Sequence, residues 1–448
     1  MTRLPGSLLI VTTSREEAER AAEDLRALGI TVGLLEVKGL LFTPPDQLER
    51  MVEKEASKYD LVVLPGTYPY DLSGLGGKYV KGPEGLWLLL DVITSFGVDA
   101  LSPSLPFEKA NPDLLESLAR RRLSEMRSRS SPIPAAPPPI SVLSEVLIGE
   151  SGAGEEVIAR AEALVADGAD YVVLAPVKSG LVDEVAGIAD ELRARLPGVR
   201  LGLDSDLGSL ARLSDRFDIL LSLPARAASS GLGWARSREL VVTAGPEEET
   251  YVEEALREAE KWGVRPVLDP IALPTPKPGL IGTIERLRFL ARFRAPKMIG
   301  ASNVVELMDA DTSGSVALLT SLAAELGVSA LLVEEASPKA RGLTAEARAA
   351  ADMASLALLW GKSAKDLGVS LLNSKLKTAQ ASMGGVEVRQ EGSSGAELQL
   401  RDGTKIYVDC RDPCPLGRLA AVKDPGVASF AAVLLYRACL PWSSRWRC

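Results

Sequence analysis

The chain contains no histidine among its 448 residues. Without imidazole, three kinds of site are excluded: histidine-based nucleophile triads, histidine metal centres and imidazole acid–base catalysis. Proton transfer must therefore fall to carboxylates, lysine, tyrosine, cysteine or water.

Cysteine is scarce and confined to the end of the chain, at Cys410, Cys414, Cys439 and Cys448. The first two form a CxxxC pair, which is open to three interpretations: a disulfide, a metal pair or free thiols. Zinc is weakly indicated because no second CxxC pair is present. A disulfide is plausible if the source is a hyperthermophile, where intracellular bridges occur.

Long apolar runs and basic clusters with interleaved aromatics are also missing. Leu8–Val11 is too short for a signal peptide, and Arg437 interrupts the most apolar stretch, 427–442, so no run approaches the ~20 residues of a membrane span. The formal charge of −9 and pI near 5.1 give no footprint for nucleic acid. We expect a cytoplasmic protein with no nucleic-acid or membrane partner; the sequence leaves a homodimer open.

Residues 1–125 alternate short apolar runs with helical patterns. Strands are expected at 8–11, 31–37 and 59–66, with helices at 15–28 and 45–58. This alternation predicts an N-terminal doubly wound α/β domain of the flavodoxin or Rossmann type. No GxGxxG follows the first strand, so dinucleotide binding is not indicated. A Pro/Ser-rich stretch, 126–140, predicts a linker.

Residues 141–362 contain eight apolar runs separated by segments of mostly helical periodicity. Their rhythm and length predict a central (β/α)8 TIM barrel. The weakest helix lies between Pro224 and Arg238. Residues 363–448 predict a small α+β region, with a hairpin turning at Asp402-Gly403. The eight runs are 142–148, 171–175, 199–203, 217–223, 239–244, 266–268, 297–299 and 328–333.

Three polar residues follow three of the predicted barrel strands. Asp204, Asp269 and Asn303 would meet at the carboxyl end, where TIM barrels carry their chemistry. Together they suit a flat heterocycle with N–H donors, because a carboxylate binds a guanidine-like edge bidentately. The structural alternatives are a helix N-cap for Asp204 and a turn residue for Asp269.

Further binding candidates lie on the same rim. Lys339 and Arg341 follow the eighth strand, near the usual phosphate site of TIM barrels; the alternative is that they are solvated loop charges. Asp311 is also a candidate helix cap. The rim additionally presents Glu145 or Glu150, Thr243 and Glu334-Glu335. The remaining candidate ligand contacts are Lys178, Ser222, Glu306 and Asp309.

Several of these segments resemble the pterin-binding barrels, the superfamily of dihydropteroate synthases and corrinoid-dependent methyltetrahydrofolate methyltransferases. The resemblance is carried by Gly168-Ala169-Asp170, Leu203-Asp204-Ser205 and Leu268-Asp269-Pro270. The patterns at 303–311 and 334–342 are similar to an archaeal group of dihydropteroate synthase-like proteins, which also carry an N-terminal α/β domain. The resemblance implies that Asp204 and Asp269 hold the pterin ring.

The chain departs from the synthase pattern at three places. Ala301-Ser302-Asn303 stands where synthases usually have Ser-Arg-Lys, and is more like the methyltransferase branch. Leu221-Ser222-Leu223-Pro224 replaces the usual Asn-Asp. The Arg-x-His pair that binds pyrophosphate is absent, and Lys339 and Arg341 are its candidate substitutes.

The resemblance implies a synthase that condenses a 6-hydroxymethyl-dihydropterin pyrophosphate with an arylamine and releases pyrophosphate, with Mg²⁺, in folate or methanopterin biosynthesis. One alternative is a pterin-dependent methyltransferase acting with a corrinoid protein, in which Asn303 assists at the ring nitrogen. Another is a non-catalytic binder of pterin or phosphate ligands.

Overall fold

The computed structural model describes residues 4–128, 132–149 and 154–371 of the chain, and short segments beyond them. Those segments are 386–391, 395–400, 405–409, 417–419, 431 and 435. The chain divides into two compact units, Met1–Leu371 and Leu372–Cys448. Among the residues so described, no helix has both the length and the apolar character needed to cross a bilayer.

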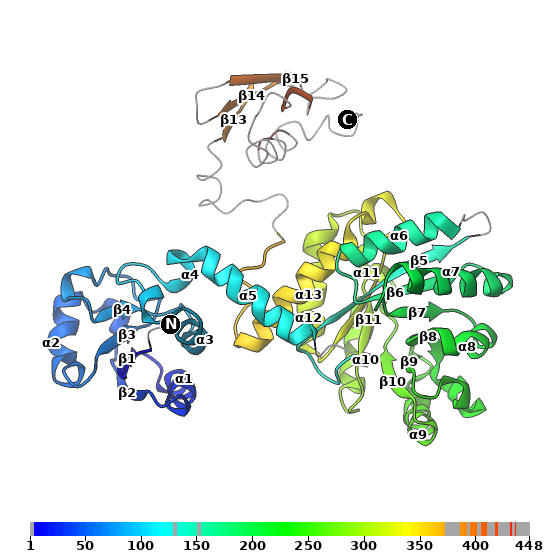
Figure 1. Cartoon of the computed structure of the whole chain (residues 1–448), viewed down its shortest axis with the longest axis horizontal. Coiled ribbons are helices and arrows are strands. Elements are labelled where there is room, and N and C mark those ends of the chain that lie inside the picture. Colours follow the sequence, from blue (N-terminus) through cyan, green and yellow to red (C-terminus); the bar gives the residue numbers. More distant parts are fainter. Residues whose placement is uncertain are drawn as a thin grey trace. The chain divides into compact units, whose positions relative to one another are not determined.

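The N-terminal region is built on a four-stranded parallel sheet of order β2-β1-β3-β4 (Figure 1). Successive side chains of β1 point to opposite faces: Leu8 and Ile10 pack with α1 and α3, while Leu9 and Val11 pack with α2. Helices therefore cover both faces of the sheet. The elements are β1 (Ser7–Thr12), α1 (Arg15–Ala27), β2 (Thr31–Glu36), α2 (Pro45–Ala56), β3 (Leu61–Leu64), β4 (Tyr79–Lys81), α3 (Leu89–Phe96), α4 (Phe107–Ala110) and α5 (Pro112–Arg127).

The central region is an eight-stranded parallel sheet of order β10-β9-β8-β7-β6-β5-β12-β11 (Figure 1). A parallel bridge between Leu268 and Lys297 joins its two outer strands, so the sheet curls into a barrel. The predicted eight parallel strands are confirmed. They are β5 (Ser141–Ile148), β6 (Tyr171–Pro176), β7 (Leu201–Asp204), β8 (Ile219–Pro224), β9 (Glu239–Thr243), β10 (Arg265–Asp269), β11 (Met298–Gly300) and β12 (Ala330–Glu334).

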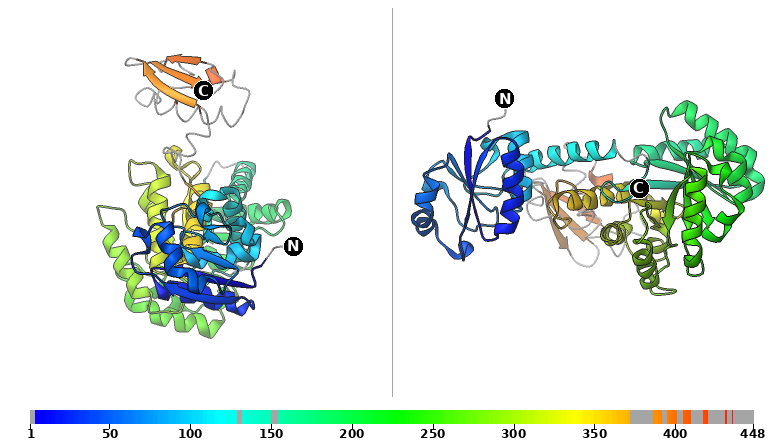
Figure 2. Two further views of the ribbon diagram at one scale, coloured as in Figure 1. Left: turned by 90° about the vertical axis from the view of Figure 1, so that its left-hand side faces the viewer. Right: turned by 90° about the horizontal axis from the view of Figure 1, so that it is seen from below.

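Helices surround this sheet (Figure 2). The segment between β8 and β9, where the sequence gives its weakest helical pattern, instead forms two 3₁₀ turns, η7 (Ala225–Ser230) and η8 (Gly233–Ala235). The α-helices are α6 (Gly154–Ala166), α7 (Val182–Arg195), α8 (Leu207–Leu213), α9 (Val252–Trp262), α10 (Leu280–Leu290), α11 (Ser302–Val305), α12 (Thr312–Glu325) and α13 (Leu343–Trp360).

The inside of the barrel is filled by an apolar plug. Alternate residues of the strands face inward, among them Leu143, Val173, Leu221 and Val267, and pack into one buried cluster. The outward-facing residues pack under the surrounding helices. Gly202 is required here, because a Cβ at this position would lie 2.9 Å from the Cγ2 atom of Val173.

Part of the Pro/Ser-rich stretch predicted as a linker packs against the amino end of the barrel. The Ile133 side chain is buried in the same cluster as the apolar plug. Its backbone N–H donates to Glu239 over 2.7 Å, and the second carboxylate oxygen of Glu239 accepts from the Tyr171 hydroxyl over 2.6 Å. Residues 132–140 therefore close the amino end of the barrel, and α5 occupies the beginning of the stretch.

The C-terminal unit contains a three-stranded antiparallel sheet, β13 (Val386–Glu391), β14 (Gly395–Leu400) and β15 (Lys405–Asp409), in that order. β14 and β15 pair directly, with Gln399 opposite Lys405. The turn expected at Asp402-Gly403 lies outside the described residues, as do all four cysteines.

Candidate functional site

Four carboxylates face the barrel axis at the carboxyl end of the sheet, where TIM barrels carry their sites. In each strand the carboxylate lies two residues beyond an inward-facing residue of the plug, so by alternation it also points inward. We call these four residues the mouth carboxylates: Glu145 on β5, Asp204 on β7, Asp269 on β10 and Glu334 on β12.

The mouth carboxylates make no ion pair within the described part of the chain. Burial raises the pKa of Glu145 to about 8, and the charges of Asp204 and Glu334 add to the effect. Burial likewise raises the pKa of Asp269 to about 6; the Ile271 N–H and Arg286 oppose the shift, while Asp204 adds to it. The mouth therefore holds excess negative charge and resists its own full ionisation.

The remaining two carboxylates show the same direction of shift. The pKa of Asp204 is raised by burial and lowered in part by a hydrogen bond from Ser222. The pKa of Glu334 is raised by burial and by the nearby charge of Glu306. A shared upward shift is typical of functional sites, where charges are held without partners.

A strained turn fixes the Asp269 carboxylate. Its Oδ1 atom accepts the Ile271 N–H over 2.8 Å, and Ile271 has a φ of 54°, which a β-branched residue rarely adopts. Buried Arg286 on α10 secures the turn, donating to the carbonyls of Pro270 over 2.8 Å and Ile271 over 3.1 Å. The sequence analysis missed Arg286, because nothing in the helical pattern of 280–290 separates it from the neighbouring Arg288.

Asp204 and Ser222 come together through a β-bulge. Strand β8 shifts register between Leu220 and Leu223, and Ser222 takes a φ of 67°. Its hydroxyl then hydrogen-bonds to Asp204. The helix-cap role considered for Asp204 belongs to Asp206, whose Oδ1 atom accepts the N–H groups of residues 208 and 209 over 2.9 and 3.2 Å.

Asn303 lies on the rim at the end of β11. A Cβ on Gly300 would lie 3.2 Å from its Nδ2 atom, so the amide lies close over the strand end. The neighbouring Ser302 ties this end to β12, because its hydroxyl accepts the Glu334 N–H over 2.7 Å. The structure thus gathers the three principal predicted residues, Asp204, Asp269 and Asn303, at the carboxyl end of one sheet.

The Lys339 side chain hydrogen-bonds to the loop after β11. Its ammonium group donates to the carbonyls of Val305 over 3.0 Å and Glu306 over 2.8 Å, and also to the carbonyl of Met308. An ammonium has three donors, so in this arrangement none is left for an anion. The Glu306 carboxylate accepts from the Ser337 hydroxyl over 2.9 Å. Lys339 and Glu306 therefore link the loop after β11 to the loop after β12.

The other predicted contacts are more exposed. Arg341 is exposed and makes no hydrogen bond or ion pair within the described residues. Lys178 is exposed just after β6, and Asp309 is exposed in the loop after β11. Asp311 occupies the N-cap position of α12, but its side chain makes no cap hydrogen bond.

A groove of about 750 Å³ lies between α6 and the carboxyl ends of β5 and β12. Its volume lies in the range of small-molecule sites. Within the described chain, no three Asp, Glu or Cys residues are grouped so as to hold a metal ion. Charged residues lining the groove are Glu145, Glu156, Arg160, Glu334, Glu335 and Arg341.

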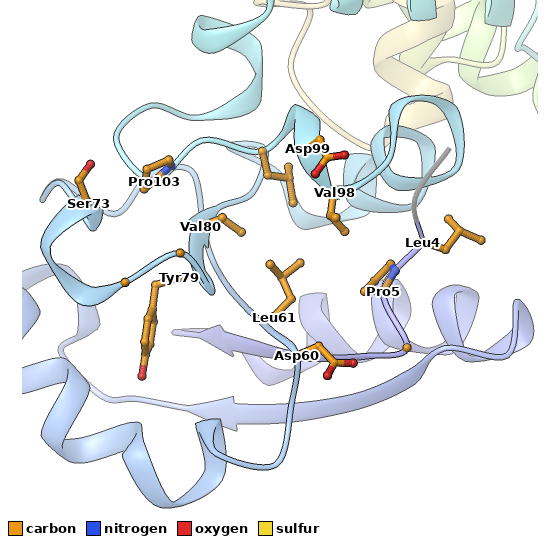
Figure 3. Close-up of a pocket in the computed structure, with 14 residues that line it drawn as sticks. Leu4, Pro5, Asp60, Leu61, Ser73, Tyr79, Val80, Val98, Asp99 and Pro103 are labelled. Atoms are coloured by element: carbon orange, nitrogen blue, oxygen red, sulfur yellow. The ribbon is translucent and has the colours of Figure 1, made fainter. Parts of the chain in front are cut away.

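A second hollow, of about 590 Å³, lies in the N-terminal region (Figure 3). Its lining includes Asp60, Leu61 and Tyr79, at the amino ends of β3 and β4. The Asp60 carboxylate accepts the N–H and hydroxyl of Ser7 over 3.0 and 2.9 Å, which holds two strand starts together. Open α/β sheets bind ligands at the opposite edge, so we place no site here.

Comparison with known proteins gives partial likenesses. No protein-family profile matches the chain. "Uncharacterized protein MJ0107" of Methanocaldococcus jannaschii is 34% identical over 130 residues, 28% of this chain and 25% of that protein, so the match spans about a quarter of the relative.

The similar solved structures include dihydropteroate synthases. The Thermus thermophilus enzyme is 19% identical, with a TM-score of 0.38 over 47% of this chain and 92% of that chain. The Coxiella burnetii enzyme, solved in complex with pteroic acid, is 15% identical, with a TM-score of 0.40 over 48% and 92%. Over about half of its length, the chain is thus similar to dihydropteroate synthases, at low sequence identity.

Proposed function

We propose that the chain binds a reduced pterin in the barrel mouth and acts as a transferase of the dihydropteroate synthase type. The observation that carries this proposal is the pair Asp204 and Asp269, two inward carboxylates without ionic partners above an apolar plug. A pterin offers what this site lacks: adjacent N–H donors on one edge, which a carboxylate accepts bidentately, and a flat apolar face.

Asp269 is the anchor of this arrangement. Its Oδ1 atom is held by the Ile271 N–H, so the group is oriented and its remaining acceptor capacity is left to a ligand. Asp204 is oriented in turn by the Ser222 hydroxyl. Groups held before the ligand arrives lose little entropy on binding, which favours affinity and specificity.

The proposed reaction joins a 6-hydroxymethyl-dihydropterin pyrophosphate to an arylamine. The bond between the methylene carbon and the pyrophosphate oxygen breaks, the amine nitrogen bonds to that carbon, and the nitrogen loses a proton. In archaea the arylamine would be a ribofuranosyl-aminobenzene phosphate, on the route to methanopterin-type carriers. The chain has no imidazole, so carboxylates with raised pKa values are the acid–base groups at hand.

Pyrophosphate would meet the rim cations in this scheme. Arg341 and Lys178 are exposed there, whereas the donors of Lys339 are already used by carbonyls. Mg²⁺ would enter bound to the pyrophosphate, as part of the substrate, and we derive no step from it.

Methyl transfer is the second candidate, favoured by the position of Asn303. Its amide lies at the end of β11 over Gly300, where it would assist at the ring nitrogen of a methylated pterin. The methyl group would then pass to a corrinoid protein. A third outcome, binding of pterin without turnover, uses the same site.

Calorimetry with 6-hydroxymethyl-dihydropterin pyrophosphate and Mg²⁺ tests the proposal. A charge-assisted hydrogen bond is worth about 1.5–3 kcal/mol, so Asp204→Asn and Asp269→Ala should each weaken binding by about 10- to 100-fold. Glu156→Gln, which removes an exposed carboxylate in the first turn of α6, at the same end of the barrel, should bind as wild type does. Absence of binding by wild type would refute the pterin proposal.

Product analysis then separates the reactions. Pyrophosphate release on adding p-aminobenzoate or its ribofuranosyl analogue supports the synthase. Binding without release in either case rejects it, and methyl loss from a methylated pterin in the presence of a methyl-accepting corrinoid protein would support the alternative.

A further inference from the structure

Glu145 lies between two other mouth carboxylates. On one side it pairs in register with Glu334 of the adjacent strand β12; on the other, β6 separates it from Asp204 of β7. All three carboxylates face inward at the same end of the barrel. Glu145 makes no hydrogen bond or ion pair within the described part of the chain.

The cations near Glu145 are engaged elsewhere or lie on the rim. Arg160 of α6 donates to the carboxylate and carbonyl of Glu335, over 2.9 and 3.2 Å, and Lys339 donates to backbone carbonyls. The charged residues of the groove that faces Glu145 are Glu156 and Arg160 from α6 and Glu334, Glu335 and Arg341 from the end of β12 and the loop after it; Asp204 and Asp269 face it across the mouth.

This environment keeps a proton on Glu145. Burial and the charges of Asp204 and Glu334 together hold its pKa at about 8, above the value of about 6 for Asp269. At neutral pH most of the side chain is therefore a carboxylic acid, which has one O–H donor.

Two hydroxyl donors of the mouth are already used. The Ser222 hydroxyl bonds to Asp204, and the Thr243 hydroxyl donates to the Leu223 carbonyl over 3.4 Å. A ligand with both N–H groups and acceptor atoms needs a donor as well as carboxylate acceptors. Strand β5 lies opposite strands β8–β10 in the barrel. A hydrogen-bond donor on Glu145 would therefore face the ligand from the side opposite Asp269.

Resting on the proposed function, we propose that Glu145 acts as a neutral carboxylic acid that donates a hydrogen bond to a carbonyl oxygen or unprotonated ring nitrogen of the bound pterin. Asp204 and Asp269 accept hydrogen bonds from N–H groups of the ring, and Glu145 donates a hydrogen bond to an acceptor atom of the ring. The site then selects a lactam-type heterocycle, which carries donors and an acceptor together. A ring without that acceptor leaves the Glu145 proton without a partner.

The test is calorimetric binding of 6-hydroxymethyl-7,8-dihydropterin, which carries no pyrophosphate, from about pH 7, where Asp269 is already mostly ionised, to about pH 9.5. Wild-type affinity should fall as the pH rises above about 8, approaching tenfold per pH unit once the donor is ionised. Glu145→Gln keeps an N–H donor that does not titrate, so its affinity at neutral pH should stay within about threefold of wild type and its profile should be flat.

Two variants serve as controls. Glu156→Gln removes a charge from the same groove and should keep the wild-type profile, including any titration of the ring itself. Glu334→Gln removes a negative neighbour of Glu145, so the fall should persist with a lower midpoint. Glu145→Leu, which has no donor, should bind weakly at every pH.

Three results would overturn the inference. One is a flat wild-type profile, which would leave pterin binding standing. Another is an unchanged fall in Glu145→Gln, and the third is a flat profile in Glu334→Gln but not in Glu145→Gln, which would place the proton on Glu334. Absence of binding by wild type would overturn the proposed function together with this inference.

Discussion

Asp269→Asn should stabilise the protein while removing the proposed ligand anchor. The pKa of Asp269 rises from an ordinary value of 3.8 to about 6, chiefly through burial. A folded-state pKa above the unfolded value means that this group favours folding at low pH and that the contribution is lost as the pH rises through about 6. Each pH unit between the two values corresponds to about 1.36 kcal/mol, so the ionised carboxylate costs about 3 kcal/mol above pH 6.

The asparagine variant keeps the acceptor for the Ile271 N–H and carries no charge. We therefore expect its free energy of unfolding to exceed that of wild type by up to about 3 kcal/mol at pH 7.5 and to match it near pH 4. Urea unfolding followed by circular dichroism, repeated from about pH 4 to pH 8, measures the difference, which should grow up to about pH 6 and then stay constant.

Asp309→Asn is the matched control, because its carboxylate is exposed at the same end of the barrel. It should change stability little and with no such pH dependence. A variant Asp269→Asn that is less stable than wild type above pH 6, or a difference independent of pH, would refute the view that this carboxylate is held at a cost to stability.

Four further substitutions test other parts of the structure. Gly202→Ala places a Cβ 2.9 Å from a methyl group inside the barrel and should lower stability by about 1–3 kcal/mol, seen as a lower Tm; an unchanged Tm would show that the plug yields. Arg348→Met removes the guanidinium that pairs with Asp170 and Asp352, which keep their contacts with Arg200 and Arg127; it should cost about 1–3 kcal/mol in urea unfolding at neutral pH, whereas wild-type stability would show that the pairs contribute nothing. Lys339→Met should speed amide hydrogen exchange in the loop after β11, and Arg341→Met should instead leave exchange unchanged and weaken binding of the pyrophosphate-bearing pterin; the reverse pattern would contradict their assigned roles.

The barrel was predictable because its signal is local. A parallel strand buried on both faces reads as a continuous apolar run, and eight such runs match the eight strands. The missing helix between β8 and β9 was equally visible as a gap in periodicity. The packing of Ile133 beneath the barrel was not visible, because a proline-rich composition indicates an irregular backbone but not what that backbone contacts.

The site was predictable only as far as the rule of strand ends reaches. That rule brings Asp204, Asp269 and Asn303 to one mouth. It could not show the bulge that turns Ser222 onto Asp204, since nothing in a short apolar run fixes its register. It also could not show that the Lys339 ammonium group donates to backbone carbonyls, because that contact depends on the path of a neighbouring loop.

The two ends of the barrel treat carboxylates differently, and the contrast argues for function at one of them. At the amino end, Glu239 accepts two hydrogen bonds, and Arg348 pairs with Asp170 over 2.8 Å and Asp352 over 2.7 Å. The chain can thus supply partners for buried charge. Among the described residues, the mouth carboxylates pair with no such cation, although burying charge without a partner destabilises the fold. This contrast supports the proposal that the mouth carboxylates accept hydrogen bonds from donors of a bound ligand.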